Sequence, residues 1–357
     1  MKLPIKSHLR GLKRTPLGET GRGGFLRLDL NEGAGLPEGF VKMAASGLTS
    51  DFLSRYPEYH GLKKLLARHN HLRPENISLG NGSDGVIKNI FEVFVGKGDR
   101  VLMTDPTFAM YPIYCRMFQA RARSVPYRVD LAFPYDEFSS RLVPGVRLAI
   151  LVNPNNPTGT ALAPERVLTL ARKARRHGTL FLVDEAYFYF CPKTLMPWVG
   201  KPDNLIVLRT FSKLCGLAAG RLGYAAASPD IVHALRSTKS VFDVNSLSVF
   251  FAERLLREPA LLGRLRAEAR DGKEWILSRL RREGVPHVAG EANFILIECG
   301  PQAVARLVRM LARRKVLVSG GFPHEGLRGC IRVTTGSRSA MAGFWRNFLP
   351  MWRAACR

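Results

Sequence analysis

Residues 210–224 read TFSKLCGLAAGRLGY, and the fold of the whole chain is interpreted outward from this stretch. It places one lysine, Lys213, among hydroxyl groups, glycines and an arginine. The apolar run at 205–208 precedes it and predicts a short buried strand. Lys213 is therefore expected in the loop beyond a strand end, where open α/β sheets usually carry reactive groups.

Three polar neighbours of this lysine are suited to binding a phosphate group. Thr210 and Ser212 offer hydroxyls, and Arg221 offers a planar guanidinium with several donors. A lysine beside a phosphate site can form a Schiff base with an aldehyde cofactor that carries the phosphate, which indicates pyridoxal 5'-phosphate. A solvated loop lysine is the alternative, and it is preferred unless the remaining parts of such a site occur elsewhere.

Two further strand ends carry side chains that the ring of this cofactor requires. The apolar run 181–183 leads into Asp184, a carboxylate that could keep a pyridine nitrogen protonated. Another apolar run leads into NPNNPTG at 153–159, an irregular turn from which Asn156, together with Tyr187, is suited to the phenolic oxygen. The alternatives are a capping role for Asp184 and an amide of Asn156 that only closes its own turn.

The segment GNGSD at 80–84 opens a predicted helix. Small residues at a helix start leave backbone N–H groups free for a phosphate, and the helix dipole favours the negative charge. Gly82, Ser83 and Asp84 are therefore candidate cofactor ligands. A plain N-cap formed by Ser83 or Asp84 is compatible with this role.

Taken together, these motifs resemble those of the fold-type I, pyridoxal-phosphate-dependent aminotransferases of class I/II, and most closely the histidinol-phosphate aminotransferase branch. In chain order they are Arg55-Tyr56-Pro57, Gly80 to Asp84, Asp105 to Tyr111, Asn153 to Gly159, Asp184 to Tyr187, Ser212-Lys213 with Arg221, and Ile331 to Thr334. Each motif is short, but the ordered set, with a lysine eight residues before an arginine, is specific to this family.

The resemblance implies roles for residues that composition and spacing do not assign. It implies that Tyr56 reaches across a homodimer interface to the cofactor phosphate of the neighbouring subunit, so that the active site is shared. It implies that Phe108 stacks on the pyridine ring, the alternative being a core phenylalanine. Arg332 occupies the position of the arginine that holds the acidic group of the substrate, where Asn156 is also expected.

Two departures from the histidinol-phosphate branch concern the substrate. Gly33-Ala34-Gly35 replaces an Asn-Pro-aromatic segment, and Ser319 occupies the position of a second phosphate-binding arginine. Losing one charged ligand weakens phosphate binding by about 1.5–3 kcal/mol, roughly ten- to a hundredfold. We therefore expect transamination, but not an orthodox histidine-pathway substrate.

The resemblance implies that Lys213 forms the Schiff base and shuttles a proton between Cα and the cofactor, while Asp184 and Tyr187 complete the catalytic set. The expected reaction moves an amino group between an amino acid or phosphorylated amine and a 2-oxo acid. Decarboxylation, cyclisation or oxidation at Cα, as in secondary metabolism, is the close alternative. A nucleic-acid-binding protein on a vestigial aminotransferase fold is the remote one.

Composition limits the partners. The 357 residues include 54 Lys and Arg against 29 Asp and Glu, a formal net charge of +25 that favours anionic ligands. Basic clusters at 172–176 and 313–315 fall on predicted helices and are expected to be solvated faces. Six scattered cysteines lack metal-ligand spacing, and no apolar run is long enough for a membrane span. We expect a cytoplasmic enzyme with no metal, no membrane association and no specific nucleic-acid partner.

The order of strand and helix patterns predicts an α/β protein. Strand candidates alternate with helical stretches to about residue 230, which predicts a mostly parallel, helix-covered sheet. We expect an N-terminal arm at 1–35 that joins the small domain, a large cofactor-binding domain at 36–235, and a smaller α+β domain at 236–357.

Overall fold

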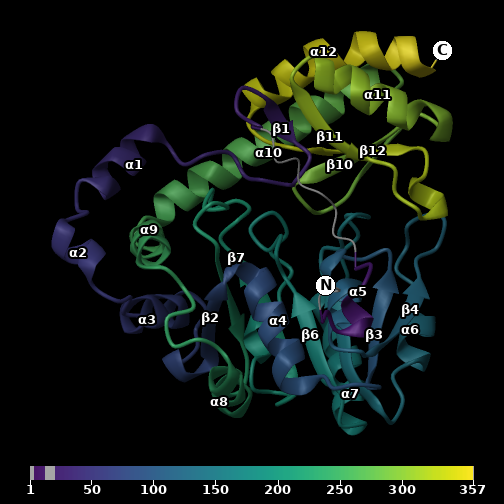
Figure 1. The fold of residues 1–357 in the computed structure, drawn as a ribbon. Coiled ribbons are helices and arrows are strands. Elements are labelled where there is room, and N and C mark those ends of the chain that lie inside the picture. Colours follow the sequence, from purple (N-terminus) through teal and green to yellow (C-terminus); the bar gives the residue numbers. More distant parts are fainter. Residues whose placement is uncertain (1–3, 13–20, 357) are drawn as a thin grey trace.

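The computed structural model describes residues 4–12 and 21–356, so part of the expected N-terminal arm lies outside the described residues. Two sheets form the framework (Figure 1). Within the described residues, no helix combines the length and the apolar character needed to cross a bilayer.

The larger sheet has seven strands in the order β2-β8-β7-β6-β5-β3-β4. Six strands run parallel, and β8 runs antiparallel to both of its neighbours. The prediction of a mostly parallel sheet is therefore confirmed. The strands are β2 (Ile77–Asn81), β3 (Arg100–Asp105), β4 (Arg121–Pro126), β5 (Val146–Val152), β6 (Leu180–Asp184), β7 (Leu205–Thr210) and β8 (Leu222–Ala226).

Helices cover both faces of this sheet, and the side chains of each strand alternate between the two cores. In β5, Leu148 and Ile150 pack towards one core while Ala149 and Leu151 pack towards the other. The first core contains α4 (Gly82–Phe94), α5 (Met110–Met117) and α8 (Pro229–Thr238). The second contains α3 (His60–His69), α6 (Tyr135–Ser140), α7 (Pro164–Arg176) and α9 (Ser246–Leu256). Near-continuous apolar strands are the expected result of burial on both faces.

The smaller sheet has five strands in the order β1-β11-β12-β10-β9. They are β1 (Leu26–Leu28), β9 (His287–Ala289), β10 (Phe294–Glu298), β11 (Val316–Gly320) and β12 (Cys330–Thr334). A third core joins this sheet to α10 (Pro259–Arg282), α11 (Pro301–Arg313) and α12 (Arg338–Cys356). Because β1 pairs with β11, the N-terminal segment is built into this sheet.

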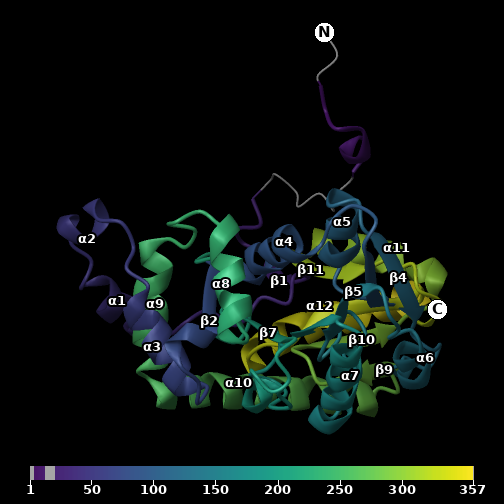
Figure 2. The ribbon, with the colours of Figure 1, turned by 90° about the horizontal axis from the view of Figure 1, so that it is seen from below.

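The long helix α10 contributes to both parts of the molecule. Leu261, Leu262 and Leu265 near its start pack in the core of the larger sheet, while Ile276 and Leu277 near its end pack beside the smaller one. Figure 2 shows α10 running along the molecule beneath both sheets. The division of the chain at residues 35/36 and 235/236 stays a prediction.

Short elements lie around this framework. Helices α1 (Glu38–Ala45) and α2 (Ser50–Ser54) lie beside α9 at one end of the molecule in both ribbon views. The described part of the arm includes the 3-10 turn η1 (Ser7–Leu9), and Arg10 accepts a hydrogen bond from Arg116 of α5 through its carbonyl. Further 3-10 turns are η2 (Pro74–Asn76), η3 (Met196–Trp198) and η4 (Glu325–Leu327).

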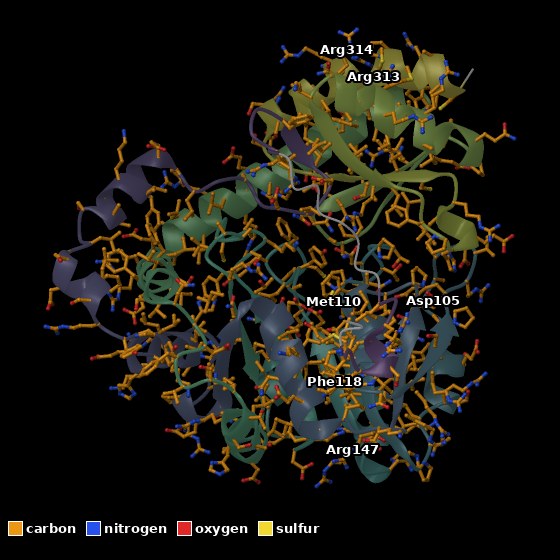
Figure 3. All side chains as sticks on the ribbon, viewed as in Figure 1. Asp105, Met110, Phe118, Arg147, Arg313 and Arg314 are labelled. Atoms are coloured by element: carbon orange, nitrogen blue, oxygen red, sulfur yellow. The ribbon has the colours of Figure 1, made fainter. Side chains whose placement is uncertain are left out.

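The two basic clusters lie on helix surfaces. Arg172, Arg175 and Arg176 of α7 are exposed, and so are Arg313 and Arg314 at the end of α11, which project from the smaller sheet's outer layer (Figure 3). The prediction of solvated helix faces is confirmed for these arginines, whereas Lys173 is half-buried and its Nζ donates to the carbonyl oxygen of Ser139.

Candidate active site

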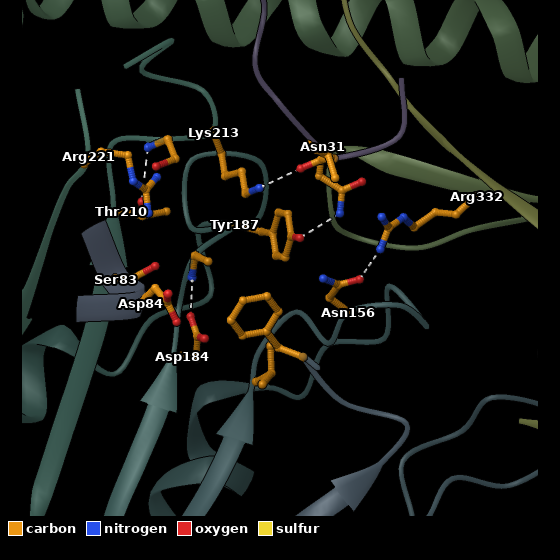
Figure 4. Close-up of a pocket in the computed structure, with 15 residues that line it drawn as sticks. Asn31, Ser83, Asp84, Asn156, Asp184, Tyr187, Thr210, Lys213, Arg221 and Arg332 are labelled. Atoms are coloured by element: carbon orange, nitrogen blue, oxygen red, sulfur yellow. Dashed lines mark hydrogen bonds between the residues drawn. The ribbon is translucent and has the colours of Figure 1, made fainter. Parts of the chain in front are cut away.

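A cavity of about 250 Å³ lies between the carboxyl edge of the larger sheet and the smaller sheet (Figure 4). It is lined by Leu30, Asn31, Ser83, Asp84, Phe108, Val152, Asn156, Asp184, Ala186, Tyr187, Thr210, Ser212, Lys213, Arg221 and Arg332. Strands β5, β6 and β7 end at this cavity because the carboxyl ends of parallel strands meet at one edge.

Lys213 lies in the loop that follows β7. Its Nζ donates a hydrogen bond to the carbonyl oxygen of Leu30 at 3.0 Å. Burial, and then the positive charge of Arg332, lower the pKa of the Lys213 amine to about 8. A larger fraction of this amine is therefore neutral near pH 7 than of an ordinary lysine, which is what a nucleophilic amine requires.

Asp184 ends β6 and is buried. Its Oδ2 accepts a hydrogen bond from the hydroxyl of Tyr111 at 2.7 Å, and its Oδ1 accepts one from the backbone N–H of Ala186 at 3.0 Å. Burial nevertheless raises the pKa of this carboxyl to about 6. This carboxylate is held in position, but the neighbouring positive charge does not offset the cost of its burial. A protonated ring nitrogen beside it would supply the missing counter-charge.

The end of the cavity away from Arg332 is formed by the start of α4 and by Arg221 (Figure 4). Gly82 has φ +72°, and a Cβ there would lie 2.6 Å from Nη2 of Arg221, so only glycine allows this approach. The backbone N–H of Ser212 donates to Oγ1 of Thr210 at 3.1 Å. Hydroxyls, a guanidinium and a helix N-terminus converge here, and this donor set fits a phosphate group.

Phe108 is a further residue of the cavity wall. Its ring meets Tyr111 edge-on, with the ring centroids 5.9 Å apart. It is half-buried and also packs against the core beneath it. An aromatic face at this position fits a planar heterocycle, and with the lysine, carboxylate and phosphate donors it completes the features expected of a pyridoxal phosphate site.

Arg332 of β12 approaches the cavity from the smaller sheet. Its guanidinium donates to Asn156 Oδ1, to the carbonyl oxygen of Asp29 at 2.7 Å and to Oγ of Ser319 at 3.3 Å. Its Nε is buried and has no hydrogen-bond partner among the described residues. Burial lowers the pKa of Arg332. An anionic ligand would satisfy the remaining donor capacity of this guanidinium.

Ser319 lies directly opposite Arg332 in the pairing of β11 with β12. Its hydroxyl donates to the carbonyl oxygen of Asp29 at 2.7 Å. Of the described residues that line the cavity, Lys213, Arg221 and Arg332 are the cations. The end of the cavity next to the smaller sheet therefore presents a single guanidinium.

The structure brings eleven of the predicted site residues to the cavity wall: Ser83, Asp84, Phe108, Asn156, Asp184, Tyr187, Thr210, Ser212, Lys213, Arg221 and Arg332. Gly82 lies directly behind Arg221 rather than on the wall. Tyr56 lies elsewhere: its side chain is 75% exposed and stacks on Phe242 with ring centroids 4.2 Å apart. The functional roles of these residues stay predictions.

Four lining residues were not predicted: Leu30, Asn31, Val152 and Ala186. Leu30 takes part through its backbone carbonyl, which no side-chain pattern announces. Asn31 donates from Nδ2 to the hydroxyl of Tyr187 at 2.8 Å, and an isolated asparagine after a short strand was its only sequence signal. Within the described part of the chain, no three His, Cys, Asp or Glu side chains are placed to hold a metal ion.

The structure explains why position 33 is a glycine. A Cβ built there would lie 1.8 Å from the carbonyl oxygen of Lys213. The segment after Asn31 therefore passes the lysine loop at a distance that only glycine permits. Gly33 sets this close approach, and the backbone of the N-terminal segment forms part of the cavity as a result.

Comparison with known proteins gives consistent similarities. Residues 28–344 match the family model described as aminotransferase class I and II. The histidinol-phosphate aminotransferase of Caldanaerobacter subterraneus is 35% identical over 320 residues, which cover 88% of this chain and 89% of the relative. That of Symbiobacterium thermophilum is 34% identical over 328 residues, covering 89% and 88%. The crystal structure of histidinol-phosphate aminotransferase from Sinorhizobium meliloti in complex with pyridoxal-5'-phosphate superposes with a TM-score of 0.82 at 25% identity, covering 92% of this chain and 91% of that chain.

Proposed function

Because the chain belongs to the family of class I and II aminotransferases, we propose that the cavity around Lys213 is the site where it moves an amino group between an amino compound and a 2-oxo acid. Pyridoxal 5'-phosphate is the cofactor of this reaction. One observation carries the proposal. A half-buried lysine whose pKa is lowered to about 8 shares a cavity with a buried carboxylate and with a cluster of phosphate donors.

The cofactor, when bound, supplies an aldehyde that condenses with amines and a ring that accepts electrons from Cα. In this proposal Ser83, Thr210, Ser212 and Arg221 hold its phosphate. Asp184 holds the ring nitrogen, and the Tyr111 hydroxyl and the Ala186 N–H keep that carboxylate in place. Lys213 would bind the aldehyde and, as a free amine, would move the proton at Cα of the substrate.

The substrate proposal rests on the single guanidinium at the smaller-sheet end of the cavity. Arg332 is already oriented by Asn156, Asp29 and Ser319, so little side-chain entropy is lost when it binds an acid. With Ser319 as its neighbour, no second cation from a described lining residue is available for a second acidic group. We therefore propose an amino substrate with one acidic group and an otherwise neutral side chain.

We also propose that the enzyme works as a homodimer. Met43, Leu53 and Tyr56 expose large apolar side chains on and beside α1 and α2, and Val241 and Phe242 do so close by. The stacking of Tyr56 on Phe242 joins these two segments into one apolar surface. Exposed apolar surfaces of this kind mark protein interfaces, and a second copy of the chain would bring Tyr56 to the neighbouring site.

Five of the six cysteines are buried and all six are free thiols. Free thiols persist in reducing compartments, and this supports the proposal that the enzyme works in the cytoplasm.

The test of the function is product analysis. Purified protein loaded with pyridoxal phosphate is offered neutral amino acids, dicarboxylic amino acids and histidinol phosphate with several 2-oxo acids. Formation of a new 2-oxo acid or aldehyde and a new amino acid, without release of carbon dioxide, is expected. Carbon dioxide release would contradict transamination, and a clear preference for dicarboxylic or phosphorylated donors would contradict the single-acid substrate.

A further inference from the structure

Asn31 is held in an unusual conformation at the junction of the two sheets. Its side chain is 1% exposed and its φ is +54°, a left-handed conformation that asparagine tolerates better than most residues. The Nδ2 of Asn293 donates to its carbonyl oxygen at 3.1 Å, and its own N–H donates to Oγ1 of Thr334 at 3.0 Å. Both partners belong to the part of the chain that forms the smaller sheet, so Asn31 is anchored from that side.

The direction of the Asn31 amide follows from these bonds. Oγ1 of Thr334 accepts the backbone N–H of Asn31, and its own hydrogen is then directed to Asn31 Oδ1 at 3.3 Å. Nδ2 must therefore face the hydroxyl of Tyr187, 2.8 Å away. A flipped amide would leave the Thr334 hydroxyl between two donors and its own hydrogen without an acceptor.

The consequence concerns the proton of Tyr187. Its hydroxyl oxygen accepts from Asn31, and within residues 4–12 and 21–356 Asn31 is the one hydrogen-bond partner of this hydroxyl. The O–H bond is thus left free to donate into the cavity that Tyr187 lines. We infer that Asn31 is a positioning residue, which fixes the direction of the Tyr187 proton so that it is donated to the phenolic oxygen of the cofactor. This inference rests on the cofactor site proposed above.

The same segment also reaches the lysine. The carbonyl oxygen of Leu30 accepts the hydrogen bond of Lys213 Nζ, and the next residue orients Tyr187. Two adjacent residues of the N-terminal segment therefore contact the two groups that face the reactive end of the cofactor in the proposed site. In this way Thr334 of the smaller sheet, which sets the direction of the Asn31 amide, acts on the hydrogen bonding at the larger sheet.

The test is the pH titration of the absorbance of bound pyridoxal phosphate. A donor at the phenolic oxygen stabilises its anion, so losing that donor raises the pH at which the bound chromophore gives up its proton. We expect Asn31→Ala to raise the titration midpoint by about 0.4–1 pH unit. Asn31→Asp keeps the shape and the tolerance of positive φ, but its carboxylate draws the Tyr187 proton away from the cavity and is expected to raise the midpoint as well.

A double-mutant cycle separates orientation from general loosening of the structure. In a Tyr187→Phe background, Asn31→Ala is expected to leave the midpoint unchanged, because the hydroxyl through which it acts is gone. Asn293→Ala is the matched control: it removes the hydrogen bond to the Asn31 carbonyl and leaves the amide, so its midpoint is expected to match that of the unmodified protein.

The inference is overturned if Asn31→Ala leaves the midpoint in place, or if it moves the midpoint equally with and without the Tyr187 hydroxyl. Failure of the proposed function has a different signature. In that case the unmodified protein itself would not hold the cofactor as a proton-sensitive chromophore.

Discussion

At Lys213, burial and the charge of a neighbouring residue shift the pKa of the amine in the same direction. Both the low-polarity surroundings and the guanidinium of Arg332 disfavour its ammonium form, and they lower its pKa to about 8. Glu32 and Asp184 oppose this shift without reversing it. The amine is therefore partly neutral in the pH range in which most enzymes work.

The rate at which the cofactor-free protein takes up pyridoxal phosphate is expected to depend on this pKa. About a tenth of the amine is neutral at pH 7, against about one part in three thousand for an ordinary lysine. The rate of the absorbance change on mixing should rise roughly tenfold per pH unit below pH 8 and level off above it. Lys213→Ala should show no covalent uptake, and a flat profile from pH 6 to 9 would contradict the lowered pKa.

Asp184→Asn should stabilise the cofactor-free protein while it inactivates the enzyme. The pKa of the Asp184 carboxyl in the folded state, about 6, lies above its unfolded value, so ionisation costs stability as the pH rises through about 6. Asparagine removes that cost. We expect the free energy of unfolding to increase by about 1–3 kcal/mol at pH 7.5 and to change little near pH 4.

Denaturant unfolding of the two cofactor-free proteins at both pH values measures this difference. Activity of the loaded variant should fall roughly a hundredfold or more, because the ring nitrogen loses its counter-charge. A variant that is less stable than the unmodified protein at pH 7.5 would contradict an uncompensated charge at this position.

At the scale of elements, the start of α4 depends on one glycine. Gly82→Ala would place a Cβ 2.6 Å from Arg221 Nη2 and would displace the guanidinium. The dissociation constant of pyridoxal phosphate is expected to rise roughly ten- to a hundredfold through loss of a charge-assisted bond.

Gly98→Ala is the matched control for this substitution. Gly98 has φ +87°, and no atom lies within 4 Å of the position that an alanine methyl group would take there, so the substitution carries the same backbone cost without the contact. Both variants should lose stability, and equilibrium binding should be weakened in Gly82→Ala alone. Equal weakening in both would show that backbone strain, rather than Arg221, is responsible.

The pairing of β11 with β12 places Ser319 opposite Arg332 and so determines the charge at the end of the cavity next to the smaller sheet. Ser319→Arg would place a second guanidinium beside Arg332. We expect KM for dicarboxylic and phosphorylated donors to fall roughly ten- to a hundredfold, while KM for neutral amino acids changes little. Ser319→Ala, which adds no charge, should leave this preference unchanged, and its steady-state kinetics serve as the control.

At the scale of the whole molecule, the exposed apolar surface around Tyr56 predicts association. Phe242→Asp would place a charge within this surface and is expected to weaken dimerisation roughly thirtyfold. Val288→Asp on β9 is the control, since Phe242 and Val288 are equally exposed, at 46%. Sedimentation should detect a shift towards monomer in the first variant alone, and a monomeric unmodified protein would contradict the proposal.

The sequence predicted a large part of the fold and of the cavity because the relevant signals are local. Apolar runs of the length of a strand and turns rich in proline and glycine placed Asp184, Asn156 and Lys213 at strand ends. Those strand ends meet because parallel strands present their carboxyl ends at one edge. The order of the motifs supplied the family, and the family supplied the fold.

Other features depend on contacts between distant parts of the chain. Leu30 lies 183 residues from Lys213, and Asn31 lies 156 residues from Tyr187. No local sequence pattern indicates such pairings. Because Leu30 acts through its backbone carbonyl, its residue type does not indicate its role either. The direction of the Asn31 amide likewise depends on Thr334, which lies 303 residues away.

The sequence by itself therefore determined the alternation of strands and helices, the reactive lysine and the chemistry that its neighbours allow, because these follow from residue type and short-range spacing. Only the tertiary structure decided that the N-terminal segment passes Lys213, that one guanidinium lies at the end of the cavity next to the smaller sheet, and that Asn31 donates a hydrogen bond to Tyr187. The physical reason is that these features arise where two sheets pack together, and hydrogen-bond partners across such a junction are set by packing rather than by sequence neighbours.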